Sequence, residues 1–279
     1  MVHFNFDVKV NDKTYNINGE KFQSADDFFN TNRSREVVRN DWEDSEANDY
    51  SFTKVHSYDE AKDLLFKGYK EALDEYVKVL NIEGNQKKKI TFKNDIVGFQ
   101  PNVPNYLMGI PKSMINSHTS YVKTPVLDIY YDPRFSGSTD KEQFIKAGKK
   151  ILTAIMTLEK MNYKINLYYS NFKCRDNSNN INVCSIKLKD SNRPLNINRI
   201  TFPMAHPAIL RVFSFEWMSK VPNGTYYSGY GQGFFNAIPE KNRRGILDAC
   251  FGTNSRYLIA ENIVDMDVDE IMEVIKNGR

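Results

Sequence analysis

The chain has 279 residues, of which 41% are hydrophobic, 26% charged and 13% aromatic. These values are ordinary for a globular protein with one sizeable core. The net charge is only +3, from 38 basic and 35 acidic side chains. A balance this even does not by itself indicate a nucleic-acid binder, which usually shows a basic excess or a clustered basic patch.

The sequence also bears on cellular location. The first residues lack the charged-then-apolar layout of a signal peptide, and no stretch approaches the apolar length of a transmembrane helix. Three cysteines (Cys174, Cys184 and Cys250) form no CxxC pair, and their odd number favours reduced thiols. We therefore expect a soluble, cytoplasmic protein with no membrane partner.

The first part of the chain shows local patterns for a hairpin and helices. Apolar and polar residues alternate over residues 2–17 around a turn at Asn11, which predicts a β-hairpin with one buried face. Ser24 is placed to cap a short helix. Ser57 with Glu60 forms a capping box for a helix whose apolar period continues to Leu80.

Two segments rich in Pro, Gly and Tyr interrupt these patterns. Residues 98–114 contain three prolines and two glycines, and residues 222–239 contain several tyrosines and glycines. We interpret both as long loops, the first also as a connector, and long loops on a rigid scaffold often carry recognition. Tyr106, Tyr230 and Phe234 are therefore predicted to contribute to a partner or ligand surface. The equally weighted alternative is that these rings pin the loops to the core.

The centre of the chain predicts a strand, a helix and a strand. Val126 to Tyr131 is an apolar run, interrupted by Asp128, and is typical of a buried parallel strand. Thr139 and Glu142 are placed to cap a long helix, and Ile165 to Tyr169 supplies the next strand. A polar loop over 171–180 and a strand over 181–188 then predict an antiparallel hairpin. The helix has an apolar stripe for packing on a sheet: Phe144, Gly148, Ile151, Ile155 and Leu158.

The last third contains weaker signals. Leu195 to Phe202 is predicted as a strand or an extended arm, and Pro207 is placed in the first turn of a helix through Trp217. Tyr257 to Ala260 is predicted as a short strand. Asp267, with Glu270 three residues later, caps a final helix.

The strand ending at Asp132, followed by a hydroxyl-containing loop and a helix, resembles the start of a von Willebrand factor A domain. In that family this position holds a divalent cation through oxygen ligands. Asp132 and Ser136 match the first and last positions of that family's Asp-x-Ser-x-Ser motif, and Ser138 follows as a further candidate ligand, but Arg134 replaces the first serine. A guanidinium has a full positive charge and no acceptor, so we expect the site to be degenerate and empty. No cofactor is expected, with Mg²⁺ at this site as the alternative.

His206 and Arg211 lie around the helix that Pro207 begins. His206 could act as a general base or ligand, although a hydrogen-bonded structural histidine is the commoner outcome when no partner lies at readable spacing. Arg211, with Arg243 and Arg244, would line a basic groove if the protein binds nucleic acid. The four histidines show no zinc spacing, and no phosphate-loop, dinucleotide or triad motif is present.

Several stretches resemble an uncharacterised family of tailed-phage proteins over roughly residues 50–235. They are Val97 to Leu107, Leu158 to Tyr163, Phe202 to Pro207, and Gly229 to Gly231. The resemblance implies a phage or prophage origin and brings no activity with it.

We expect a three-layer, Rossmann-like α/β domain of von Willebrand A type over residues 98–279, with an N-terminal α+β extension over residues 1–97. The function expected first is a phage accessory protein that binds a host or virion protein and is not an enzyme. The alternatives are a nucleic-acid-binding protein of phage DNA metabolism and a metal-dependent hydrolase, the latter disfavoured because no acidic cluster of the two-metal kind is visible.

Overall fold

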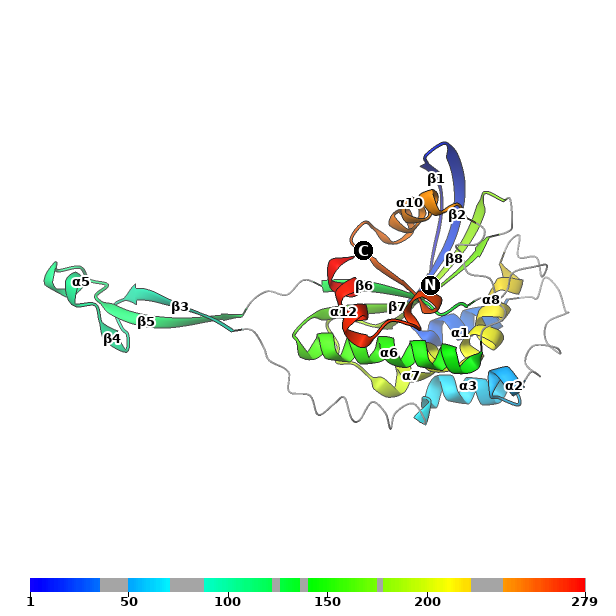
Figure 1. Cartoon of the computed structure of the whole chain (residues 1–279), viewed down its shortest axis with the longest axis horizontal. Helices are drawn as coiled ribbons and strands as arrows, with labels where there is room; N and C mark the ends of the chain where they lie inside the picture. The colour runs from blue at the N-terminus through cyan, green and yellow to red at the C-terminus, as the bar shows by residue number, and fades with distance from the viewer. Residues whose placement is uncertain are drawn as a thin grey trace.

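The computed structural model in Figure 1 is a mixed α/β structure with two separate sheets. It describes seven stretches of the chain: residues 1–35, 50–70, 88–121, 126–135, 140–174, 178–221 and 238–278. The segments predicted as the helix beyond residue 70 and as the loop over 222–237 fall outside these stretches, as do Thr139, Ser136, Ser138, Tyr230 and Phe234.

The main sheet has six strands in the order β1-β2-β8-β7-β6-β9. The pairs β2–β8, β7–β6 and β6–β9 are parallel, whereas β1–β2 and β8–β7 are antiparallel. The strands of this sheet are β1 (Val2–Val10), β2 (Lys13–Phe22), β6 (Val126–Asp132), β7 (Lys164–Cys174), β8 (Asn180–Lys189) and β9 (Arg256–Ile259).

Helices cover both faces of this sheet. They are α1 (Ala25–Arg33), α2 (Tyr50–Thr53), α3 (Tyr58–Lys67), α6 (Lys141–Lys160), α7 (Ile197–Ala205), the π-helix η2 (Ile209–Ser214), α8 (Phe215–Lys220), α10 (Glu240–Phe251), α11 (Ala260–Ile263) and α12 (Val268–Asn277). Because one layer of helices packs on each face of the sheet, the predicted α/β class is confirmed.

The larger core lies between the sheet and helix α6. The predicted apolar stripe of this helix is confirmed, since Phe144, Gly148, Ile151, Ile155 and Leu158 are all buried. Gly148 is required by a close helix crossing: a Cβ atom there would lie 2.0 Å from the carbonyl oxygen of Met204 in α7. The absence of a side chain thus lets α6 and α7 approach closely.

A smaller core lies on the opposite face, beneath α10. Tyr15 and Ile17 of β2, Val183 of β8, and Ile246 and Leu247 of α10 belong to this one buried cluster. The sequence analysis predicted no helix over residues 240–251. With only a few apolar positions and Arg243-Arg244-Gly245 in its middle, this segment has a weak helical period, and its amphipathic face becomes evident only against the sheet.

Local capping signals match the structure well. Ser24 accepts a hydrogen bond from the backbone N–H of Asp27, and Ser57 accepts one from Glu60. Asp267 and Glu270 form the complete predicted capping box of α12. The turn at Asn11, with φ of 55°, joins β1 to β2 as predicted.

Three predictions differ from the structure. Residues 195–202 are not a strand, because Asn196 caps helix α7 and Ile200 to Ala205 are all buried in it. The second half of α7 is buried without a gap, and a short buried run of this kind cannot be told from a strand by its periodicity. The polar stretch from Asn171 to Cys174 belongs to strand β7 and pairs with β8. Finally, residues 98–114 were predicted as a long loop, but they contain the short strand β4 (Gln100–Pro101) and the helix α5 (Val103–Leu107).

The predicted division of the chain also differs from the sheet topology. The hairpin of β1 and β2 does not form a separate extension, because β2 pairs in parallel with β8 over Asn16 to Phe22. The boundary predicted at residues 97 and 98 falls within the second sheet, between β3 (Lys88–Asp95) and β4 (Gln100–Pro101).

Candidate functional site

The second sheet forms a small unit that we call the 88–121 module. It has three strands in the order β3-β5-β4, where β5 is Met114–Tyr121, and a five-residue helix α5 (Val103–Leu107) follows β4. In Figure 1 the module, in teal, stands apart from the six-stranded sheet. None of residues 90–119 is buried, so the module has no core of its own.

The tip of the module, residues 96–111, is held by asparagine side chains. Asn102 caps α5 by accepting a hydrogen bond from Asn105 N–H at 3.4 Å, and its own amide donates to Asn94 at 3.1 Å. The amide of Asn105 donates to the carbonyl of Lys112 at 3.3 Å. Pro104 lies in the first turn of α5, where its fixed φ suits the helix. These contacts give the tip a defined conformation.

The tip exposes large apolar side chains and has no charged residue. Between Ile96 and Pro111 there is no Asp, Glu, Lys or Arg. The large apolar residues exposed here are Ile96, Val97, Phe99, Val103, Tyr106, Leu107, Met108 and Ile110, with Leu107 at 78% and Tyr106 at 70%. Scattered exposed apolar residues are normal on a protein, whereas a concentration of them in one short, charge-free segment is a candidate interaction surface. Tyr106, a residue predicted from sequence, belongs to it.

The predicted metal site is filled by an arginine side chain. Asp132 lies at the carboxyl end of β6, as predicted, and is 1% exposed. Arg134 donates from its backbone N–H and from Nε to the Asp132 carboxylate, and its guanidinium also contacts the carbonyl of Phe172. Tyr257 of β9 donates its hydroxyl to the same carboxylate at 2.5 Å.

The positive charge beside the Asp132 carboxylate is supplied by the guanidinium of Arg134. Burial disfavours the charged guanidinium, but Asp132 outweighs that effect and raises the pKa of Arg134. Burial, followed by the nearby Asp132 charge, raises the pKa of Tyr257 well above its ordinary value, so its hydroxyl remains a donor. Among the residues that the structure describes, no group of three His, Cys, Asp or Glu side chains is placed to hold a metal.

His206 lies inside the protein, not on its surface. Its ring is 2% exposed and packs on Phe202 and Tyr69, with ring centroids 5.1 and 4.7 Å away. Its Nδ1 accepts a hydrogen bond from Ala208 N–H at 3.3 Å. Burial lowers the pKa of His206 to about 4, so the imidazole is neutral at physiological pH.

A cavity of about 990 Å³ adjoins this histidine. Its lining includes His206, Tyr69 and Ile145 together with the polar side of α3. The lining contains both lysines and carboxylates, and Lys67 pairs with Asp63 at 2.5 Å. Because the lining carries both positive and negative side chains, it favours neither an anionic nor a cationic ligand.

Arg211 does not join Arg243 and Arg244 in one groove. The guanidinium of Arg211 lies over the rings of Phe52 and Phe215, at 4.6 and 5.4 Å. Its helix η2 packs in the larger core, whereas α10, which carries Arg243 and Arg244, packs in the smaller core on the opposite face of the sheet.

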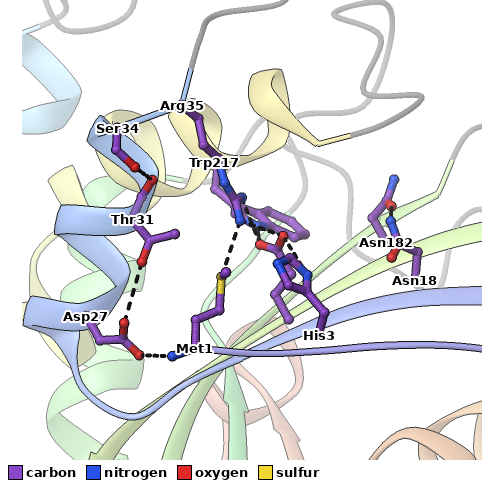
Figure 2. Close-up of polar contacts among 10 residues, drawn as sticks. Met1, His3, Asn18, Asp27, Thr31, Ser34, Arg35, Asn182 and Trp217 are labelled. Carbon is purple, nitrogen blue, oxygen red and sulfur yellow. Dashed lines mark hydrogen bonds and ion pairs between the residues drawn. The ribbon is translucent and has the colours of Figure 1, made fainter.

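The sequence analysis missed a buried carboxylate at Glu20. Arg35 binds it through both terminal nitrogens, at 2.7 and 2.9 Å, and the indole N–H of Trp217 donates to it at 2.8 Å. His3 lies 3.4 Å from the same carboxylate. Figure 2 shows these side chains converging from β1, the end of α1 and α8. Because the partners come from distant parts of the chain, no sequence spacing marks them.

The described structure defines a mixed α/β protein with a six-stranded mixed sheet and an exposed antiparallel module. The chain belongs to the family described as domain of unknown function DUF7192, which matches residues 9–273. That range includes the 88–121 module, so the module lies within the family's domain. No match is found among curated proteins or among solved structures. Of the described helices, none has the length and apolarity needed to cross a bilayer.

Proposed function

We propose that this protein acts by binding another protein through the tip of the 88–121 module. The observation that carries the proposal is the charge-free, apolar tip, whose conformation is defined by hydrogen bonds while its large side chains stay exposed. A surface that is already ordered before binding loses less conformational entropy when the complex forms. Aromatic residues and methionine are also enriched at protein interfaces, and Tyr106 and Met108 are of these types.

The charges around the tip indicate the chemistry of the partner. Residues 88–121 contain four lysines (Lys88, Lys89, Lys93 and Lys112) and one acidic residue, Asp95. Lys88 and Lys89 lie at the end of β3 away from the tip, so Lys93 and Lys112 are the lysines near it. An apolar tip flanked by these two lysines fits a partner that offers an apolar pocket with carboxylates beside it. Such complementarity raises the association rate and excludes like-charged competitors.

The phage origin and the von Willebrand A-like core also remain proposals. The first is supported by the resemblance of several stretches, including Val97 to Leu107 in the module itself. The second is supported by the order of β6, α6, β7 and the antiparallel β8, with Asp132 at the end of β6. We propose on this basis a phage accessory protein whose partner comes from the host or the virion.

Affinity capture from infected host cells tests the proposed function. The full-length protein is compared with Tyr106→Ala and Leu107→Asp, which alter the tip, and with Met161→Asp as a matched control. Met161 is 46% exposed at the end of α6, so its substitution adds the same charge elsewhere. Capture of a protein that both tip variants lose and the control retains supports the proposal. Equal capture by all four proteins contradicts it.

Nucleic acid is the second candidate, favoured by the excess of lysine in the module. Treating the lysate with nuclease separates the two. If captured proteins disappear after nuclease and the purified protein binds nucleic acid with a salt-dependent affinity, the lysines and not the tip carry the function.

A further inference from the structure

The cavity beside His206, of about 990 Å³, is lined by residues of α3, the first turns of α6 and the end of α7. Its charged lining residues are exposed, apart from one half-buried lysine. By contrast, His206 and Gly68 are buried, and Leu64, Tyr69 and Ile145 are half-buried. The cavity thus has a charged rim and an uncharged floor, and we call these five residues the cavity floor.

Contacts between α3 and α7 hold the cavity floor in place. Gly68, which ends α3 with φ of 87°, lies so close to α7 that an added Cβ would be 2.2 Å from the carbonyl oxygen of Asn198. The next residue, Tyr69, donates its backbone N–H to the hydroxyl of Thr201, a buried residue, at 3.2 Å. The floor is therefore largely formed before anything binds, which is usual for small-molecule sites.

The imidazole of His206 presents a hydrogen-bond donor to this cavity. A neutral imidazole has one donor nitrogen and one acceptor nitrogen, and Nδ1 accepts from Ala208 N–H at 3.3 Å, so Nε2 carries the proton. In the described part of the chain Nε2–H has no hydrogen-bond partner, yet it is not among the fully buried atoms that lack one. Because the ring is 2% exposed and lines the cavity, Nε2–H contacts the cavity space.

We propose that this cavity binds an uncharged aromatic molecule whose carbonyl-type oxygen accepts the Nε2–H of His206. A donor in a largely buried floor loses its hydrogen bond to water on binding unless the ligand supplies an acceptor. A carboxylate would also accept this proton, but the floor carries no counter-charge, and burying an unpaired charge is costly. The ring of Tyr69 and the apolar side chains of Leu64 and Ile145 offer contacts to an aromatic body.

The size and place of the cavity define the rest of the proposal. Small-molecule sites typically measure roughly 300–1,000 Å³, so this volume holds a drug-sized ligand, and a smaller probe should occupy the floor alone. The cavity shares no residue with the tip of the 88–121 module. The inference therefore goes beyond the proposed function and does not depend on it.

Matched probes test the ligand chemistry by NMR titration of the full-length protein. Acetophenone, which is uncharged and aromatic with one carbonyl, should bind with a Kd of about 1 mM, as expected for so small a ligand. α-Methylstyrene has the same shape with a methylene group in place of the oxygen. It should bind about 3- to 10-fold more weakly, the contribution of one neutral hydrogen bond. Benzoate and benzylamine, which carry opposite charges, should both bind more weakly than acetophenone.

Variants of the chain test the location. Ile145→Trp should fill the cavity and abolish acetophenone binding, whereas Met161→Trp, the same new side chain at the exposed far end of α6, should leave it unchanged. His206→Phe removes the donor and should make acetophenone and α-methylstyrene bind equally. His206→Gln restores an amide donor and should restore the preference for acetophenone. A circular dichroism melt checks that each variant is folded.

Three results would overturn the inference: no saturable binding of acetophenone to the wild type, equal affinities for acetophenone and α-methylstyrene, or binding that Ile145→Trp leaves unchanged. If His206→Phe does not fold, the probe comparison and the two tryptophan variants still decide. The tip variant Leu107→Asp separates this site from the proposed function, because it should lose partner capture and keep acetophenone binding.

Discussion

The guanidinium of Arg134 lies on the carboxylate of Asp132, with Nε 2.8 Å from Oδ1, and both side chains are at most 2% exposed. The pair stands at the carboxyl end of β6, beside Phe172 of β7, whose carbonyl the guanidinium also contacts. Because both groups are buried, water cannot solvate the remaining charge if either Asp132 or Arg134 is replaced by an uncharged residue.

We therefore expect Arg134→Met to lower the free energy of unfolding by about 3–5 kcal/mol, because it leaves a buried carboxylate without its partner. The matched control is Lys67→Met, which breaks the exposed pair with Asp63. An exposed pair contributes about 0–1 kcal/mol. Urea denaturation measures both, and equal losses in the two variants would show that the buried pair does not stabilise the fold.

We also expect no tight Mg²⁺ or Mn²⁺ binding at Asp132, because the oxygen atoms of its carboxylate already accept hydrogen bonds from Arg134 and Tyr257. Titration calorimetry of the wild type should show no heat that depends on this residue. Micromolar affinity in the wild type that is lost in Asp132→Asn would contradict the prediction and restore the metal site.

The buried apolar stripe of α6 predicts a large loss of stability when one of its side chains is shortened and leaves a cavity. Ile155 is fully buried, so Ile155→Ala should lower the free energy of unfolding by about 2–5 kcal/mol. Lys146→Ala, on the exposed side of the same helix, should change it by less than about 0.5 kcal/mol. Equal melting temperatures for wild type and Ile155→Ala would place the stripe on the wrong face.

His206 predicts a pH dependence of stability. Its pKa falls from 6.5 to about 4 on folding because burial disfavours the imidazolium. Between these values the unfolded chain binds the proton and the folded chain does not, so stability falls as pH is lowered from about 6.5 to about 4. A shift of this size corresponds to a loss of roughly 3 kcal/mol.

Urea denaturation across this pH range measures that slope. His206→Gln should flatten it, whereas His56→Gln, at an exposed position, controls for the loss of a histidine. If His206→Gln retains the full slope, other groups are responsible for the acid sensitivity.

The sequence by itself determined the elements whose signals are local. The Asn11 turn, the caps at Ser24, Ser57 and Asp267, and the stripe of α6 depend on residues a few positions apart. Backbone preferences, caps and amphipathic periods act over such distances, and these predictions were confirmed. The position of Asp132 at a strand end was predicted for the same reason.

Only the tertiary structure decided which elements share a sheet and which faces are covered. The pairing of β2 with β8 joins residues about 160 positions apart, and the Glu20 cluster gathers His3, Arg35 and Trp217. The first part of helix α7 was mistaken for a strand or an extended arm because the continuous burial of Ile200 to Ala205 leaves too short a polar stretch to show a helical period. Residues 98–114 were interpreted as a loop, yet Gln100 and Pro101 pair with β5 and Val103–Leu107 form a helix. Pairing and burial depend on contacts between distant segments, and local spacing does not encode those contacts.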